Sequence, residues 1–366
     1  MPTLTLDQRR RYAIARSLFA PTTLPRAISK PGFVQANPIR APARAQDLTL
    51  RHRVADYRAG DLERRYPRLA IEEDVFVNYG FLPRATHALM HPRVARTRWG
   101  PARMRTVHDV LEFVREHGSV HPREVDAHFQ HGRVANWFGG TSSATTQLLD
   151  GMHYRGMLRI ARREGGVRVY APSKVAPAAR VDRAAVALRL DALIDVIVAK
   201  YAPLPSRCLG QLVGHLRAGA PQWNDARAAA LARAKQRLPK ARVDGTHWYW
   251  PEGENPASGR HALDDELRLL APFDPIVWDR MRFEAFWGWA YRFEAYVPAP
   301  KRKLGYYALP MLWRGEVIGG GNMAAEDGRL KASFGHVAGD TPKDRAFIDA
   351  RDAEVARIAA FLDLPR

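Results

Sequence analysis

The sequence has 366 residues and a formal net charge of +19, with 57 Lys and Arg against 38 Asp and Glu. This length predicts roughly two to four modules, and a composition that is 46% hydrophobic and 10% aromatic can supply buried cores. The single cysteine, Cys208, excludes an internal disulfide framework and a cysteine-based zinc site, so we expect neither a metal nor a cofactor.

The positive charge is concentrated near the N-terminus. Residues 1–105 carry 20 basic and 8 acidic residues, whereas residues 106–172 carry 8 and 7. A GC-rich genome would explain why nearly all of the N-terminal cations are arginine, but not their excess or their position. A segment this basic is typical of proteins that bind a polyanion such as nucleic acid.

No membrane segment is predicted. No apolar run approaches the ~18 residues that a bilayer-spanning helix needs, and the polar start MPTLTLDQRR lacks the apolar region of a signal peptide. We therefore expect a cytoplasmic protein without membrane contact.

The N-terminal segment begins with two predicted helices, over residues 7–20 and 24–30. The stretch GFVQANPIR that follows has strand-like character and contains two amides. Alternation along a strand sends residues i and i+2 to one face, so Gln35 and Asn37 should point the same way.

Arginines follow this amide pair. If residues 40–52 are helical, Arg40, Arg44 and Arg51 share roughly one face. That face is either a phosphate-contacting surface or an ordinary solvated one, and the pattern alone does not separate the two.

Residues 106–172 have the pattern of a winged helix. Apolar positions at helical spacing predict a first helix, a second begins at Pro122, and Ser142 or Ser143 caps a third. The stretch MLRIARREGGVRVYAP then reads as two strands joined near Gly165 and Gly166. The first helix is supported by Val107, Val110, Leu111 and Val114, with Gly118 at its end, and the third closes at Gly156. This order of elements is common in DNA-binding modules and in protein-contact modules.

The same order recurs further along the chain. A long amphipathic helix from Val186 to Tyr201 precedes a helix capped by Ser206, a third helix over residues 225–238, and a hairpin around Asp244 and Gly245. After about residue 262 the sequence is aromatic, alternating and rich in turns, which predicts an antiparallel β domain closed by a helix over residues 342–362. The Gly319–Gly321 run has no helix after it, so a β-bulge or loop is favoured over a phosphate-binding loop.

The predicted fold class is therefore α+β, with tandem winged-helix units followed by an antiparallel β-rich C-terminal domain. The expected division is a winged-helix-like unit with the amide pair over residues 1–105, winged-helix units over 106–180 and 181–261, and the β-rich domain with its terminal helix over 262–366.

Four stretches carry a resemblance to a known family: PGFVQANPIRAPARAQDL, GTHWYW, LLAPFDPIVWDR and YRFEAYVPAPKRKLGYYALP. They resemble the bacterial winged-helix DNA glycosylases that repair interstrand crosslinks (the YcaQ/AlkZ-like family), over nearly the whole chain. The resemblance implies tandem winged helices and a β-rich domain around a basic channel, location with the bacterial nucleoid, and removal of N7-alkylated purines from DNA. The family signature is Gln-x-Gln or Gln-x-Asp, which Gln35 matches and which places Asn37 at the second position.

Chemistry accounts for that signature. An N7-alkylated guanine already carries a positive charge and leaves without a general acid, so the protein has only to position water and stabilise a cationic sugar. A Gln carbonyl oxygen can accept a hydrogen bond from water, and an Asp carboxylate can also offset the charge of the sugar. No metal or nucleophile is required.

Asn37 departs from the signature because it has nearly the shape of Asp without its charge. The chain is then a slow or specialised enzyme, a binder that has lost its chemistry, or the product of an introduced Asp→Asn substitution, which the close match of the flanking motif favours. Phe81 is a second departure, because many members carry a Trp/His-containing stretch there. This leaves the lesion preference open.

Other cations and aromatics are candidate DNA contacts, each with a structural alternative. His247 and Trp248 lie on the predicted hairpin, where alternation sends some side chains into the core. The remaining candidates are basic residues that contact phosphates or only keep a surface soluble: Lys30, Arg40, Arg44, Arg51, Arg53, Lys301, Arg302 and Lys303.

These observations favour a monofunctional DNA glycosylase that acts as a monomer on double-stranded DNA carrying alkylated purines, with possible crosslink unhooking. The alternative is a non-catalytic winged-helix DNA-binding protein or transcription regulator, and a protein-interaction scaffold is third. Regulators of this kind usually bind palindromes as dimers, whereas three non-identical units in one chain favour a monomer.

Overall fold

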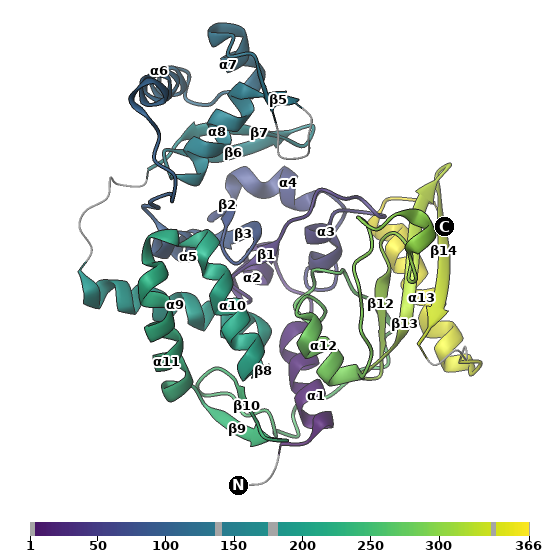
Figure 1. Ribbon diagram of the computed structural model, residues 1–366. Coiled ribbons are helices and arrows are strands. Elements are labelled where there is room, and N and C mark those ends of the chain that lie inside the picture. The colour runs from purple at the N-terminus through teal and green to yellow at the C-terminus, as the bar shows by residue number, and fades with distance from the viewer. Residues whose placement is uncertain (1–3, 136–140, 175–181, 338–341, 366) are drawn as a thin grey trace. The chain divides into compact units, whose positions relative to one another are not determined.

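The computed structural model describes residues 4–135, 141–174, 182–337 and 342–365 (Figure 1). Its contacts divide the chain into two compact units. The first unit comprises Met1–Leu62, Ile194–Val213 and Leu231–Arg366, and the second comprises Glu63–Leu193 and Gly214–Ala230. Each unit is assembled from separated stretches of sequence, so the four-part division by sequence remains an expectation.

The second unit contains the predicted three-helix-and-hairpin pattern. Helices α6 (Pro101–His117), α7 (Pro122–Phe129) and α8 (Ala144–Tyr154) precede the antiparallel hairpin of β6 (Leu158–Glu164) and β7 (Val167–Pro172). Two predicted helix caps are confirmed. Gly118 caps the end of α6, and the Ser143 side chain accepts from Thr146 N at the start of α8. A short strand pair, β4 (Arg133–Ala135) with β5 (Thr141–Ser143), was not predicted.

The second unit also contains a smaller group of elements that were not predicted from the sequence. An antiparallel hairpin leads directly into a helix, and its register pairs Asp74 with Gly80. These elements are α4 (Asp61–Arg65, which begins in the first unit), η1 (Tyr66–Arg68), β2 (Ile71–Val75), β3 (Tyr79–Pro83), α5 (Arg84–Met90) and η2 (Pro221–Ala226).

The first unit begins with the two expected N-terminal helices. Helix α1 (Leu6–Ser17) starts at a capping box in which Thr5 and Gln8 satisfy each other's backbone N–H groups. Helix α2 (Leu24–Ser29) follows, and then β1 (Val34–Gln35) and α3 (Ala45–Leu50). The predicted helix over residues 40–52 is therefore shorter than expected, because it begins only at Ala45.

Three further helices match the prediction for the following segment. They are α9 (Arg183–Tyr201), α10 (Ser206–Gly219) and α11 (Arg227–Arg237). The hairpin of β9 (Lys240–Val243) and β10 (Thr246–Tyr249) turns at Asp244 and Gly245, which both have positive φ, and β8 (Leu204–Pro205) pairs with β10. Positive φ at both central positions is the two-residue turn that Asp-Gly favours.

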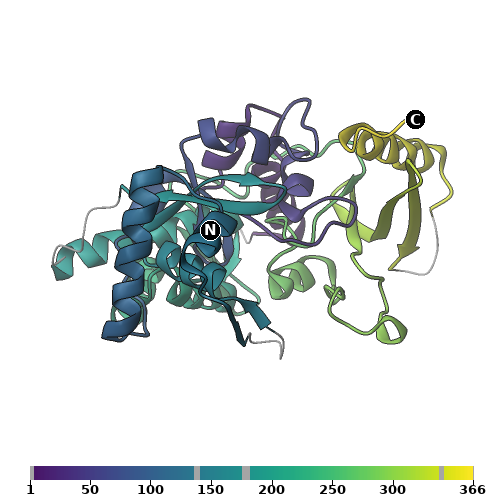
Figure 2. The ribbon, with the colours of Figure 1, turned by 90° about the horizontal axis from the view of Figure 1, so that it is seen from above.

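The C-terminal part of the first unit contains a four-stranded antiparallel sheet. The strands are β11 (Arg268–Leu269), β12 (Leu309–Trp313), β13 (Glu316–Glu326) and β14 (Arg329–His336), in that spatial order. Helix α13 (Arg345–Phe361) lies beside this sheet (Figure 2). The ring of its Phe347 contacts Trp313 and His336.

Two details of this part differ from the expectations. The Gly319–Gly321 run is not a loop, because it lies within β13. A β-bulge adjoins it, since Met311 pairs with Gly319 and Leu312 pairs with Val317, which leaves Ile318 as the extra residue. A side chain at Gly319 would reach to 2.0 Å from the Gly335 carbonyl oxygen, which explains the glycine there. Helix α12 (Arg280–Trp287) and the turn η3 (Ala299–Lys301) were not predicted.

The core of the first unit brings together residues from the first helix and from the second half of the sequence. Ala13 and Ile14 of α1 belong to the same buried cluster as Trp248, Phe283 and Phe286. Among the described helices, none is long and apolar enough to cross a bilayer.

Candidate functional site

The amide pair lies at the end of β1 and just beyond it. Gln35 is 3% exposed, and its Oε1 is buried without a hydrogen-bond partner among the described residues. Asn37 lies after the strand and is half-buried, and its Oδ1 accepts a hydrogen bond of 3.0 Å from the backbone N–H of Ile39. The strand includes only the first amide, so the shared face expected from alternation remains a prediction.

Helix α3 holds the backbone of the amide pair through Gln46, which sequence reasoning missed. Its side-chain Oε1 accepts a hydrogen bond of 3.2 Å from Asn37 N, and the residue is 4% exposed. The neighbouring Asp47 accepts instead from the Tyr57 hydroxyl at 2.6 Å and from Gly60 N, and burial raises the pKa of its carboxyl group. Gln46 is thus the group that positions the backbone of Asn37, whereas Asp47 fixes the loop that contains Tyr57 and Gly60.

Two candidate DNA contacts, Arg51 and Arg53, are buried in ion pairs within the first unit. Arg51 makes a 2.5 Å ion pair with Glu354, and Arg53 makes a 2.8 Å ion pair with Asp274, with all four side chains at most 4% exposed. These arginines join the N-terminal segment to the C-terminal part of the same unit. Their charges are already neutralised inside the protein, so they are not available to DNA phosphates. The sequence pattern could not show this because the carboxylates lie more than 200 residues away.

The other two arginines of this group occupy different places. Arg40 is exposed, whereas Arg44 is half-buried at the position just before α3. Their backbones form an antiparallel bridge, so they close a loop and do not lie on one helical face with Arg51. The expected shared face is therefore wrong, although both remain candidates for phosphate contact.

The aromatic hairpin arm is divided between core and surface. Trp248 is 4% exposed and stacks on Phe286, with the Arg9 guanidinium over its ring, which is the core position that alternation allowed for it. His247 is exposed and remains a candidate. In the C-terminal part, Lys301 and Lys303 are exposed, whereas Arg302 is half-buried and donates to the Val297 carbonyl oxygen.

A buried lysine near the amide pair was also missed. Lys200, at the end of α9, is 2% exposed, and its ammonium group donates to the carbonyl oxygen of Phe33, two residues before Gln35. Burial lowers the pKa of Lys200 to about 7, with a further lowering from Arg53 and an opposing effect from Asp274. Sequence separation hid this residue, since only Lys30 is near the motif along the chain.

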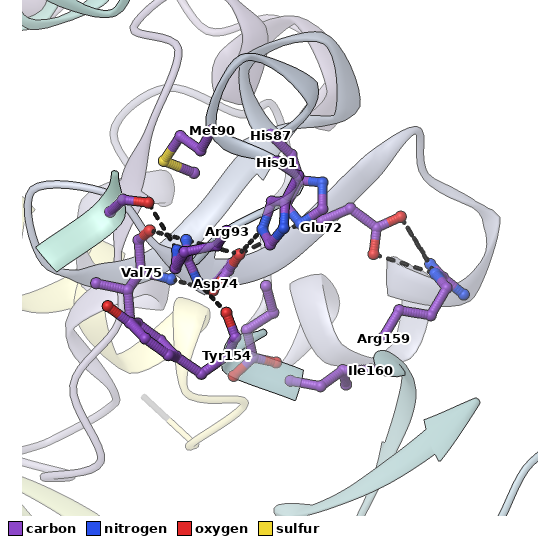
Figure 3. Close-up of polar contacts among 12 residues, drawn as sticks. Glu72, Asp74, Val75, His87, Met90, His91, Arg93, Tyr154, Arg159 and Ile160 are labelled. Atoms are coloured by element: carbon purple, nitrogen blue, oxygen red, sulfur yellow. Dashed lines mark hydrogen bonds and ion pairs between the residues drawn. The ribbon is translucent and has the colours of Figure 1, made fainter. Parts of the chain in front are cut away.

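The second unit contains a dense polar cluster around Asp74 of β2 (Figure 3). The carboxylate accepts from Arg93 at 3.0 and 3.1 Å, from His91 at 2.7 Å and from Val75 N at 2.7 Å, and His87 lies 3.2 Å away. Burial alone would raise the pKa of Asp74, but Arg93 and the two histidines hold it well below its usual range.

This cluster contains three side chains of metal-ligand type within 4.8 Å of one another. Both oxygens of Asp74 are already saturated by these donors. Burial lowers the pKa of His91 to about 4, against the opposing hydrogen bond to Asp74, so this ring is neutral and donates through Nε2. A cation would have to displace these hydrogen bonds beside the fixed charge of Arg93. We therefore interpret the cluster as a structural ion-pair network.

Comparison with known proteins identifies the family. The model of the family described as "DNA glycosylase AlkZ-like" matches residues 28–361, which include the amide pair and nearly all of both units. The solved structure of the Streptomyces sahachiroi DNA glycosylase AlkZ superposes with a TM-score of 0.67 at 15% identity, covering 100% of this chain and 98% of that one. At this identity the structural likeness supports the fold, and the family match supports the relationship. The chain therefore belongs to the AlkZ-like DNA glycosylase family.

Proposed function

We propose that this protein is a monofunctional DNA glycosylase that hydrolyses the N-glycosidic bond of N7-alkylated purines, including purines in crosslinks, through Gln35 and Asn37. Family membership supports DNA glycosylase activity and a DNA substrate. The finer proposal includes tandem winged-helix units, action as a monomer and reduced activity because of Asn37.

The observation that carries the proposal is the buried Oε1 of Gln35, which has no hydrogen-bond partner in the described part of the chain. Leaving a buried acceptor without a donor costs about 1–3 kcal/mol, and such groups are uncommon in folded proteins. A reason to retain it is that substrate or water supplies the missing donor. A water held there would be directed toward the anomeric carbon of the sugar.

Asn37 would share that water. An amide oxygen has two lone pairs, and Ile39 N uses one of them, so the other can accept from water. It carries no charge, however, and cannot stabilise the cationic sugar as a carboxylate would. Binding should therefore be intact while excision is slow.

The test is single-turnover release of N7-methylguanine from a labelled duplex. Asn37→Asp should raise the rate by about 10- to 1000-fold, as expected for one well-placed electrostatic contact. In that background, Gln35→Leu should lower the rate again but leave the melting temperature equal or higher, because it removes an unsatisfied buried oxygen.

A structural role for the amides would give the opposite pattern. If Gln35→Leu unfolds the protein or leaves base release unchanged, and if Asn37→Asp is no faster, the amide pair is not a catalytic site. A non-catalytic DNA-binding protein would then be the better interpretation.

A further inference from the structure

A cavity of about 250 Å³ lies within the first unit, and Lys200 of its lining donates to the Phe33 carbonyl oxygen just before the amide pair. Its lining includes side chains from α1, from the chain just after α2, and from the end of α9. The charged residues among them are Arg16, Lys30, Arg53, Lys200 and Glu254.

The charges of this lining do not cancel. Arg16 is paired with Glu254 at 2.6 Å, and Arg53 is paired with Asp274 at 2.8 Å. Two ammonium groups remain. Among the described residues neither makes an ion pair with a carboxylate, since Lys30 lies over the Phe19 ring and Lys200 donates to a backbone carbonyl. The cavity thus contains two lysines, Lys30 and Lys200, in addition to the two arginines that carboxylates balance.

We infer that this cavity binds a phosphate group, and that in the intact enzyme the group is a backbone phosphate of the DNA substrate. The choice of DNA rests on the proposed function. Lys200 contacts Phe33, and an extended chain spans at most about 3.6 Å per residue, so Gln35 lies only about 7 Å further along the backbone. Since the phosphates of one strand recur every ~3.4 Å of helix rise, a phosphate in the cavity would lie within a few nucleotides of the base to be removed.

The protonation of Lys200 should make phosphate binding in the cavity depend on pH. The lowered pKa of this lysine, about 7, results from burial and from Arg53, against Asp274, while Arg16, Lys30 and Glu254 line the same space. A bound phosphate would favour the ammonium form and raise that pKa. Binding must then take up a proton near neutral pH, and affinity must fall as the pH rises through 7.

The test uses the full chain, with fluorescence anisotropy on a duplex over a salt series between about 0.05 and 0.2 M. Lys30→Gln and Lys200→Met each remove one cation from the cavity, and Lys343→Gln removes an exposed cation elsewhere in the same unit as the matched control. Each cavity variant should bind about 5- to 10-fold more weakly near 0.1 M salt, with a salt slope smaller by about one, whereas the control should not. Affinity of the unaltered chain should fall about 10-fold between pH 6 and pH 8.5, and Lys200→Met should remove this dependence.

A second arm separates DNA from free phosphate by titrating inorganic phosphate alone in a calorimeter. Phosphate binding that is lost in both cavity variants, with an unchanged DNA salt slope, would keep the cavity as a phosphate site but assign it to the free anion. Variants that match Lys343→Gln in both arms would overturn the proposal. Because Lys30 is exposed, Lys30→Gln keeps the test decisive even if Lys200→Met fails to fold. These readouts measure binding only, so failure of base release in the Asn37→Asp variant would count against the proposed function alone.

Discussion

At the scale of single residues, the sequence shows which side chains are present, whereas only the folded chain shows what surrounds each of them. The amide pair was visible in the sequence because a signature is a local pattern. The positions of Arg51 and Arg53 were not, because burial depends on Glu354 and Asp274, which approach only in the folded chain. Sequence therefore identified the candidate chemistry but assigned to DNA two arginines that the fold uses internally.

Gln46 provides a prediction at this scale. Gln46→Met removes the acceptor for Asn37 N and should lower single-turnover base release about 10-fold in the Asn37→Asp background, since a lost buried hydrogen bond costs about 1–3 kcal/mol. Gln46→Glu keeps an acceptor oxygen and should recover most of the rate. Equal losses in both variants would show that the residue acts through packing and not by holding the backbone.

At the scale of elements, the sequence was informative wherever a helix or hairpin carried its own start and stop signals. Helices α6, α7 and α8 have such signals, and so does the hairpin at Asp244 and Gly245. Helix α12 was missed because its aromatic residues resembled strand alternation. Its caps were nevertheless present, since the Asp279 side chain accepts from Arg282 N and Gly288 ends the helix in the left-handed conformation.

The ion-pair network around Asp74 joins β2 to the chain beyond α5. It gives a prediction for the stability of the protein. Arg93→Met leaves the buried Asp74 carboxylate without its main counter-charge and should destabilise the protein by about 3–5 kcal/mol. The double variant Asp74→Asn with Arg93→Met should lose less, because no isolated charge remains. Denaturant unfolding measures both.

An exposed ion pair supplies the control for this prediction. Arg115→Met breaks a pair with Glu112 in which both side chains are about half exposed, and it should change stability by less than about 1 kcal/mol. A similar loss in Arg93→Met and Arg115→Met would contradict the assigned role of the network.

At the scale of the whole molecule, charge predicts how the protein binds DNA. Since the protein has a net charge of +19, its affinity for DNA should be largely independent of the DNA sequence. That affinity should fall steeply as salt rises, because basic side chains that bind phosphates release counterions from the DNA. Arg40→Ala should weaken binding to damaged and undamaged duplexes alike, since phosphate contacts carry no sequence information. A loss confined to damaged DNA would place Arg40 at the lesion, and tight preference for one operator would favour a regulator.

The assembly of the first unit has a consequence for the synthesis of the protein. Residues 1–62 share this unit with residues 231–366, and α1 belongs to the same core cluster as α12. A nascent chain emerges from the ribosome N-terminus first, so the segment with Gln35 waits for nearly all of the polypeptide before its surroundings are complete. Arg51 finds its partner only when Glu354 has been made. Interrupted translation products therefore lack the C-terminal partners of residues 1–62 in the first unit.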